Sequence, residues 1–316
     1  MKRSIPSNRK PKASTANVTA AHFQFDAIGT AWDIEVFGKE LAAAKAAELK
    51  ATILKRIDQF DKHYSRFRND SLVTAIAKSA GTYDLPADAQ PMLKLYHELY
   101  KLTSGAVTPL IGQTLSDTGY DASYTLIPKK QISQVPSWES RLNYQPPRLT
   151  VTEPVLLDFG AAGKGYLTDL IADLLQARGY ANYCINAGGD IVYHSATNDK
   201  LPIGLEHPDN PDMAIGVAHI ANQSLCGSSG NRRSWDTFHH IVDPKSLQSP
   251  QHIKAVWVTA ESGLIADGLA TALFFVPANK LKNDYTFEYA IVADDYSLEH
   301  SPHFPAEFFT NQPPGA

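Results

Sequence analysis

The stretch Asp158–Asp190, which reads DFGAAGKGYLTDLIADLLQARGYANYCINAGGD, decides how this chain folds. Apolar side chains recur at helical spacing over residues 167–175, so a helix is expected after the small-residue loop Gly160–Gly165. Gly179 is expected to end that helix. Tyr183–Ile185 then has the composition of a short buried strand. Two glycine-rich turns therefore flank one helix–strand unit, and glycine lets the backbone of each turn approach a ligand closely.

The first of these turns matches neither of the common phosphate-binding motifs. Its glycine-to-lysine spacing is too short for a Walker A loop, and Gly165 rather than Ser or Thr follows Lys164. The spacing G-x-G-x-x-G is also absent. A tight loop that only packs a helix on a sheet is an alternative explanation of the glycines, and the motifs elsewhere in the chain decide between the two.

Composition limits the class of protein. The chain has 316 residues, of which 43% are hydrophobic, and a formal net charge of −4. This is enough apolar material for one large domain or two small ones. Because the body of the chain has no long basic run, nucleic acid is not expected as a partner. The two cysteines do not make a disulfide framework.

The two ends of the chain differ from its body. Residues 1–20 are basic, rich in Pro, Ser and Thr, and lack an apolar run, so they are expected to form a disordered arm. They match neither a signal peptide, a lipid-anchoring motif nor a membrane anchor. We therefore expect no stable membrane insertion and a cytoplasmic location, with an exported mature form as the open alternative. Residues 21–300 are expected to form one domain and residues 301–316 a C-terminal tail.

The order of the expected elements indicates the fold class. Residues 111–150 are rich in proline and have no interpretable period. Elsewhere strands and helices follow one another without strict βαβ alternation, which favours α+β over a doubly wound sheet. We expect a single two-lobed domain with mixed sheets and flanking helices. Its elements are a strand pair around Ile28-Gly29-Thr30, helices at 41–60, 91–102 and 261–275, and strands near 201–205, 213–220, 223–226, 238–244, 253–260 and 287–293.

Asp267 and Thr271 lie four residues apart in ADGLATALF, within the last expected helix. This spacing puts both side chains on one helix face. A carboxylate and a hydroxyl are hard oxygen ligands, which suit Mg²⁺ better than zinc. The flanking residues are apolar, so Asp267 is expected to be partly buried, where a carboxylate needs a partner or a metal. A plain polar helix face is the alternative.

His240 and Asp243 bracket the step from a strand into a turn. Histidine is the commonest proton acceptor near neutral pH, although a purely structural histidine is the alternative. The neighbouring His239 is expected on the opposite strand face, exposed to solvent.

The order of the motifs points to a family. The chain contains, in sequence, Ile28-Gly29-Thr30, SRFRNDS, DFGAAGKGY, NAGGD, SSG, HIVDP and ADGLATAL. Together these resemble the ApbE family of flavin transferases over residues 22–295. The resemblance implies an enzyme that binds FAD and Mg²⁺, transfers FMN to a threonine hydroxyl of an acceptor protein, and releases AMP.

The resemblance also implies roles for particular residues. The metal ligands would be the side chains of Asp267 and Thr271 and the backbone oxygens of Ala161 and Ala270. Lys164 and the metal would neutralise phosphate charge, while His240 would accept the threonine proton and Asp243 would set its tautomer. Contacts to FAD are expected from the glycine turns and from aromatic side chains, namely Ile28, Tyr64, Gly119, Tyr120, Gly188, Gly189, Asp190, Ser229, Gly230 and His240.

Two other functions remain open at this stage. A FAD pyrophosphatase would use the same residues, with water in place of threonine. A non-catalytic FAD-binding protein is the third possibility, because the turn after Asp243 lacks the Thr-Gly pair that is usual in the family.

Overall fold

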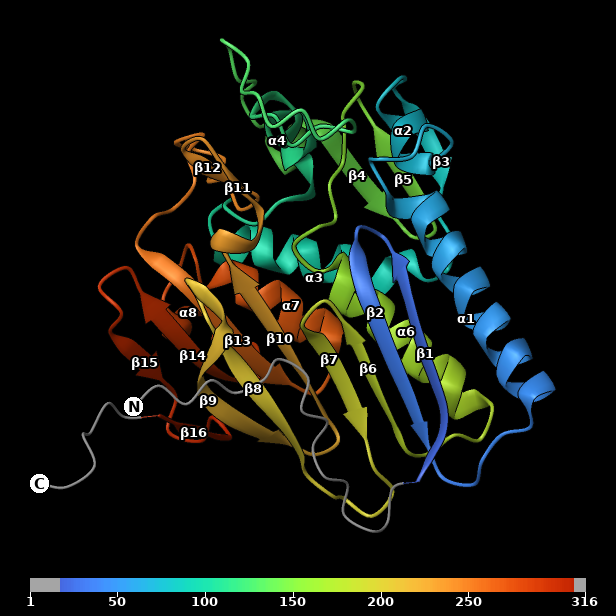
Figure 1. Cartoon of the computed structure of the whole chain (residues 1–316). Helices are drawn as coiled ribbons and strands as arrows, with labels where there is room; N and C mark the ends of the chain where they lie inside the picture. The colour runs from blue at the N-terminus through green and yellow to red at the C-terminus, as the bar shows by residue number, and fades with distance from the viewer. Residues whose placement is uncertain (1–17, 310–316) are drawn as a thin grey trace, which may run out of the picture.

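An eight-stranded antiparallel sheet forms the centre of the molecule in the computed structural model, which describes residues 18–309 (Figure 1). Its strands, in spatial order, are β1 (Thr19–Ala27), β2 (Thr30–Phe37), β6 (Tyr183–Ala187), β7 (Asp190–His194), β10 (Gln223–Ser229), β13 (Ile253–Ala260), β14 (Glu288–Ala293) and β15 (Leu298–His300). Strands distant in sequence are thus neighbours, and β2 pairs with β6 across about half the chain.

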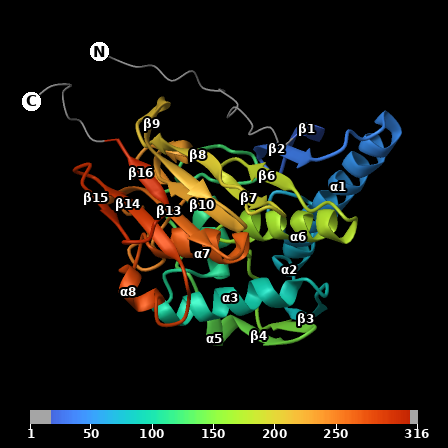
Figure 2. The ribbon, with the colours of Figure 1, turned by 90° about the horizontal axis from the view of Figure 1, so that it is seen from below.

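Layers cover both faces of this sheet (Figure 2). Helices lie on one face, with α6 and α7 against the strands, and a three-stranded sheet lies on the other. The helices are α1 (Ala43–Tyr64), α3 (Ala89–Leu102), α6 (Gly163–Ala177) and α7 (Gly263–Ala272), and the small sheet consists of β8 (Leu201–His207), β9 (Asn210–Ile220) and β16 (Ala306–Phe308).

The burial of β13 shows why its sequence is a continuous apolar run. Val256 and Val258 point into the core on the helix side, whereas Ala255 and Trp257 point into the core against the small sheet. Successive side chains of a strand alternate between its two faces. A strand that is covered on both faces therefore needs apolar residues at every position.

A second, smaller lobe lies above the large sheet in Figure 1. It contains most of the segment that the sequence pattern left uninterpreted. Its elements, with the short connecting helices and strands, are α2 (Leu72–Ile76), β3 (Gly81–Asp84), η1 (Pro109–Ile111), α4 (Gly112–Asp117), α5 (Trp138–Arg141), β4 (Leu142–Gln145), β5 (Arg148–Val151), η2 (Asn231–Arg233), β11 (Ser234–Trp235) and β12 (Phe238–His239). The remaining helix, α8 (Ala278–Leu281), follows α7.

The central stretch folds as the sequence predicted. Leu167, Ile171 and Leu175 are buried along α6, and Gly179 adopts a positive φ of 82° two residues after the helix ends. The backbone N–H of Gly188 donates to the carbonyl of Ala31 at 3.0 Å. The first strand pair and the second glycine turn are therefore in direct contact, and the predicted α+β class is confirmed.

Several expected boundaries differ from the structure. The expected strand at 238–244 is reduced to the two residues of β12, because the chain turns after His239. β1 already begins at Thr19, inside the expected arm, and β16 lies inside the expected C-terminal tail, where it pairs with β9. Residues 1–17 of the arm and the last seven residues lie outside the described residues. Between residues 18 and 309, no helix combines the length and the apolar character needed to cross a bilayer.

Candidate active site

The loop before α6 is held by hydrogen bonds at both of its ends. The carboxylate of Asp158 accepts from the backbone N–H of Gly160 at 2.7 Å and from Nε of Arg66. The N–H of Ala161 donates to the hydroxyl of Tyr96 at 3.1 Å. The N–H of Gly163 then closes the first turn on the carbonyl of Phe159. These bonds fix the direction of the loop as it enters the helix.

Helices α6 and α7 touch backbone to backbone beside this loop. A Cβ on Gly165 would collide with the carbonyl of Gly263 and would lie 2.6 Å from Cβ of Asp267. Because no side chain separates the helices, the N–H of Gly165 donates directly to Oδ2 of Asp267 at 2.8 Å. The glycines of the first turn therefore allow the two helices to pack closely and also bring the backbone to the candidate site. Both explanations that the sequence offered for these glycines apply.

The predicted pair on α7 faces the same loop. One turn beyond Asp267, the hydroxyl of Thr271 donates to the carbonyl of Ala161 at 3.3 Å. Three of the four expected metal-ligand residues, Ala161, Asp267 and Thr271, therefore lie together, although the two segments that carry them are about 100 residues apart in the sequence. Ala270 is fully buried beside them and does not line the adjoining cavity.

Buried charge is concentrated at this point. Asp267 is 4% exposed and Asp190 is completely buried, and Lys164 pairs with Asp190. Burial and the neighbouring Asp190 carboxylate raise the pKa of Asp267 well above 3.8. Burial alone would lower the pKa of the Lys164 ammonium group, but the nearby carboxylates of Asp190 and Asp267 have the larger effect and raise it. Two carboxylates share one cation here, so the site would stabilise a second cation.

The donor set suits a particular kind of cation. In the described part of the chain no cluster of three or more His, Cys, Asp or Glu side chains surrounds a metal position. The available donors are instead one carboxylate, one hydroxyl and one backbone carbonyl. Hard oxygen donors of this kind, with few charged ligands, fit Mg²⁺, which keeps several positions for water or phosphate.

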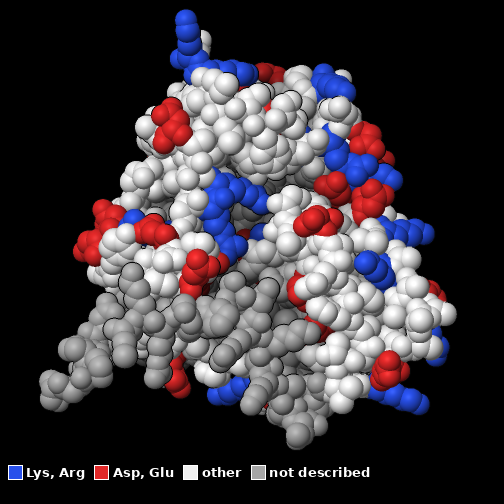
Figure 3. Space-filling model, viewed as in Figure 1, with Lys and Arg blue, Asp and Glu red and all other residues white. Residues whose placement is uncertain are grey.

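A cavity of about 660 Å³, called the central cavity below, opens in front of these residues. Basic side chains gather in the hollow in the middle of the face seen in Figure 3. Five basic and three acidic residues line the cavity: Arg66, Arg68, Lys164, Arg232 and Arg233, and Asp61, Asp158 and Asp267. The predicted site residues on its wall are Ile28, Tyr64, Tyr120, Ala161, Lys164, Gly188, Ser229, His240, Asp267 and Thr271.

The other predicted residues lie off the wall of the central cavity. Gly119 is a tight turn with φ of 104°, against the backbone of Ile127. Gly230 packs against the ring of His239, and Gly189 lines a different cavity described below. Asp190 is behind Lys164, where it acts through the ion pair.

His240 lines the central cavity, but not with the expected partner. Its Nδ1 is buried and has no hydrogen-bond partner in the described chain. The carboxylate of Asp243 instead accepts from Lys245 N–H at 2.9 Å and from the hydroxyl of Ser246 at 3.1 Å, which closes its own turn. The expected hydrogen bond from His240 to Asp243 is therefore absent. Burial and the positive charge of Arg233 lower the pKa of His240 to about 3, so the ring is neutral.

The prediction for His239 was wrong. This residue is 6% exposed. Its Nε2 lies 2.9 Å from the carbonyl of Pro250, and its backbone N–H donates to the hydroxyl of Ser249 at 2.9 Å. The side chain anchors the turn at 249–250 to β12, so it contributes to the framework that holds His240.

The sequence analysis missed all four arginines that line the central cavity, Arg66, Arg68, Arg232 and Arg233. Arg66 lies over the rings of Phe67, at 4.2 Å, and Tyr120, at 4.8 Å, and its Nη2 is buried without a partner among the described residues. Arg233 donates to the hydroxyl of Tyr120 at 2.8 Å, and Arg232 donates to the carbonyl of Gly188 at 3.0 Å. Two signals were available: Arg66 lies between the aromatic residues Tyr64 and Phe67, and an arginine pair follows the SSG turn after one intervening residue, Asn231.

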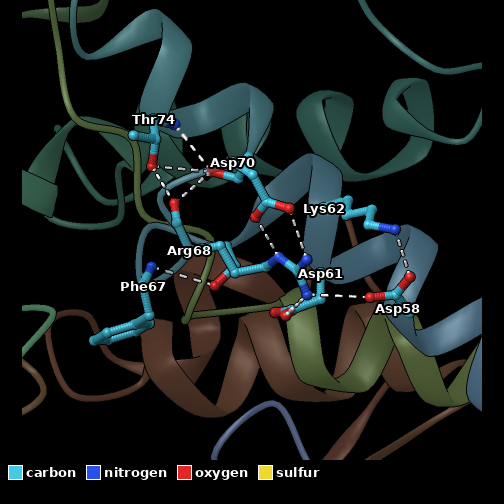
Figure 4. Close-up of polar contacts among 9 residues, drawn as sticks. Asp58, Asp61, Lys62, Phe67, Arg68, Asp70 and Thr74 are labelled. Carbon is cyan, nitrogen blue, oxygen red and sulfur yellow. Dashed lines mark hydrogen bonds and ion pairs between the residues drawn. The ribbon is translucent and has the colours of Figure 1, made fainter.

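Arg68 holds the loop that carries Arg66 (Figure 4). Its guanidinium donates to Asp58, Asp61 and Asp70 at 2.9–3.1 Å. Its backbone carbonyl accepts from the hydroxyl of Thr74, at the start of α2. The end of α1, the loop and α2 are thereby tied together, which orients the cavity-facing side of SRFRNDS.

The comparisons with known proteins agree with this architecture. The ApbE family model matches residues 28–286. A protein of Klebsiella pneumoniae named FAD:protein FMN transferase is 23% identical over 85% of this chain and 81% of its own length. One of Treponema pallidum with the same name is 25% identical over 80% of this chain and 78% of its own.

Solved structures show the same fold. The ApbE protein of Thermotoga maritima has a TM-score of 0.78 and 21% identity, covering 90% of this chain and 99% of its own. The flavin transferase ApbE of Vibrio cholerae has a TM-score of 0.72 and 21% identity, covering 90% and 97%. With the family model matched over most of its length, this chain belongs to the ApbE family.

Proposed function

We propose that this chain is an Mg²⁺-dependent transferase that moves FMN from FAD to a threonine hydroxyl of an acceptor protein and releases AMP. The observation that carries the proposal is the meeting of Asp267, Thr271 and the Ala161 carbonyl at the wall of a basic cavity. The name FAD:protein FMN transferase, borne by relatives that match over four fifths of this chain, supports the same reaction.

The central cavity suits FAD in size and chemistry. Its volume of about 660 Å³ is in the usual range for sites that enclose a large cofactor. Its excess of basic over acidic side chains opposes the negative charge of a pyrophosphate. The rings of Phe67, Tyr120 and Tyr124 contact one another on its wall and offer flat surfaces to the aromatic parts of FAD.

Mg²⁺ would be held by Asp267, Thr271 and the Ala161 carbonyl. When bound, it would neutralise charge on the pyrophosphate oxygens. Asp267 is kept in place by the Gly165 N–H, and Lys164 contributes an ammonium group beside it. The buried Nη2 of Arg66 offers a further unused donor to FAD.

His240 would act as the proton acceptor. The threonine oxygen attacks the phosphorus of the FMN half, the bond to the AMP oxygen breaks, and the threonine proton moves to the imidazole. The free chain keeps this ring neutral, which is the state that accepts a proton. Bound pyrophosphate brings negative charge opposite Arg233 and Lys164, so the pKa of His240 rises when FAD is present.

Mass spectrometry tests the proposal directly. The chain is incubated with FAD, Mg²⁺ and peptides that carry one threonine, and the products are weighed. A peptide that gains one FMN, with an equal amount of AMP, is the expected result. AMP and free FMN without a modified peptide would make the chain a pyrophosphatase. Bound FAD without any cleavage would leave only a flavin-binding protein.

A further inference from the structure

A second cavity, of about 600 Å³, lies directly beside the central cavity. We call it the β8 groove, because residues of β8 line one side of it. The strand β8 itself lies over the face of the large sheet that the helices leave free (Figure 1). The two cavities have a common wall made of Gly188, Gly227, Ser228, Ser229 and Arg232. Four of these five residues are glycine or serine, so little side-chain bulk separates the two cavities.

The charge of the β8 groove is opposite to that of the central cavity. Three carboxylates line it, from Asp26, Asp33 and Glu206, against the single cation of Arg232. Arg232 is itself neutralised by Glu206, at 2.8 Å. Nucleotide phosphates are therefore repelled from the groove and attracted to the central cavity. The β8 groove therefore suits a ligand that carries no phosphate.

The backbone of β8 indicates what that ligand is. β8 is the edge strand of its sheet, paired with β9 on one side, and no strand among residues 18–309 pairs with its other side. Ile203 and Gly204 of this strand line the groove. A free strand edge beside a groove is a place where an extended polypeptide adds as a further strand.

We propose that the β8 groove binds an extended segment of the acceptor protein alongside β8. The hydroxyl side chain of this segment crosses the small-residue wall into the central cavity, where the flavin phosphate lies. The floor of the groove is apolar, with Ile191, Leu225 and Trp257, so small or apolar side chains of the segment face the sheet. This inference rests on the proposed function, since it assigns the acceptor site of that reaction.

Gly204 permits a sharp test. It is exposed, and a Cβ at this position would meet only Cβ of Ala214, at 3.9 Å, so the strand tolerates a side chain there. Gly204 lines the β8 groove and not the central cavity, so Gly204→Trp adds a bulky side chain at the β8 side of the groove. Met213→Trp is the matched control, because Met213 lies on β9, is 51% exposed and does not line the groove. Gly204→Lys is a second blocking variant in case the tryptophan disturbs folding.

The probe is a pool of synthetic peptides with one central threonine and randomised flanks. Two quantities are measured for each full-length protein: the peptides that it retains, identified by mass spectrometry, and its affinity for FAD, from flavin fluorescence. We expect both Gly204 variants to retain peptides at least about tenfold less than the parent and Met213→Trp, with an FAD affinity that changes less than about twofold.

Three outcomes would overturn the inference. In the first, the Gly204 variants retain peptides as well as the parent, or no protein retains any. In the second, the variants lose FAD affinity together with peptides, which would make the groove part of the nucleotide site. In the third, a synthetic peptide of residues 1–17 displaces the pool, which would assign the groove to the chain's own N-terminus.

Failure of the proposed function has a different signature. A parent that retains peptides but never cleaves FAD contradicts the transferase proposal alone. The groove is then judged by whether the Gly204 variants lose those same peptides.

Discussion

Replacement of Asp267 separates a metal ligand from a structural carboxylate. Two variants are needed, because the side chain accepts the Gly165 N–H at 2.8 Å in a 4% exposed position. Asp267→Asn keeps the volume and an acceptor oxygen but removes the charge. Asp267→Ala removes all three. If Asp267 is a metal ligand, both variants lose flavin transfer, whereas a structural role would spare the asparagine variant.

The two variants should differ in the stability of the metal-free chain: Asp267→Ala should lower it, whereas Asp267→Asn should not. Asp267→Ala leaves the buried Gly165 N–H unsatisfied, which costs about 1–3 kcal/mol. Asp267→Asn keeps that bond and removes a carboxylate whose folded pKa lies above its unfolded value of 3.8. The stability that such a group contributes is present below pH 3.8 and is lost as the pH rises through the folded pKa. At neutral pH the asparagine variant should therefore melt no lower than the parent.

Melting curves with FAD, recorded with Mg²⁺ and with a chelator, complete the experiment. Mg²⁺ at a hundred times its Kd stabilises the parent by about 2.7 kcal/mol, a rise in Tm of roughly 4–5 °C for a domain of this size. Neither variant should show this rise. An unchanged parent Tm in Mg²⁺, together with full transfer in the chelator, would refute the assignment of the site.

Three further results are expected. Gly165→Ala should lower the free energy of unfolding by about 1–3 kcal/mol, because its Cβ would overlap α7. The control Gly163→Ala should melt like the parent, because its Cβ has no contact shorter than 3.5 Å. Equal melting temperatures of the two variants would contradict the close contact between the helices. Arg66→Met should lower the free energy of unfolding by about 3–5 kcal/mol, because it leaves the charge of the buried Asp158 carboxylate without a partner cation. Chemical denaturation measures this loss, and the double variant Arg66→Met with Asp158→Asn should recover part of it. For His240, whose pKa in the free chain is about 3, kcat/KM should stay level from pH 8 to about 5.5; an acid limb near pH 6.5 that vanishes in His240→Asn would show that the ring titrates normally.

The sequence alone determined the local geometry of this protein. The helical period of residues 167–175 and the positive-φ glycine at 179 predicted α6 and its end, because both depend on neighbouring residues only. The spacing of Asp267 and Thr271 placed both side chains on one helix face for the same reason. Motif order added the family, since the motifs are read in sequence without knowledge of their contacts.

Only the tertiary structure decided which of these local features meet. Arg66 and Asp158 are paired although they are 92 residues apart, and Gly165 bonds Asp267 across 102 residues. Segment 111–150 lacked a readable period because its elements are short and are stabilised by contacts with the rest of the lobe. The chain turns after β12, so His239 is buried and the carboxylate of Asp243 bonds within its own turn instead of to His240. A strand pattern continued through residues 238–244 could not predict this turn. Burial and shared charge, which set the protonation of Asp267 and His240, exist only once these distant segments are packed together.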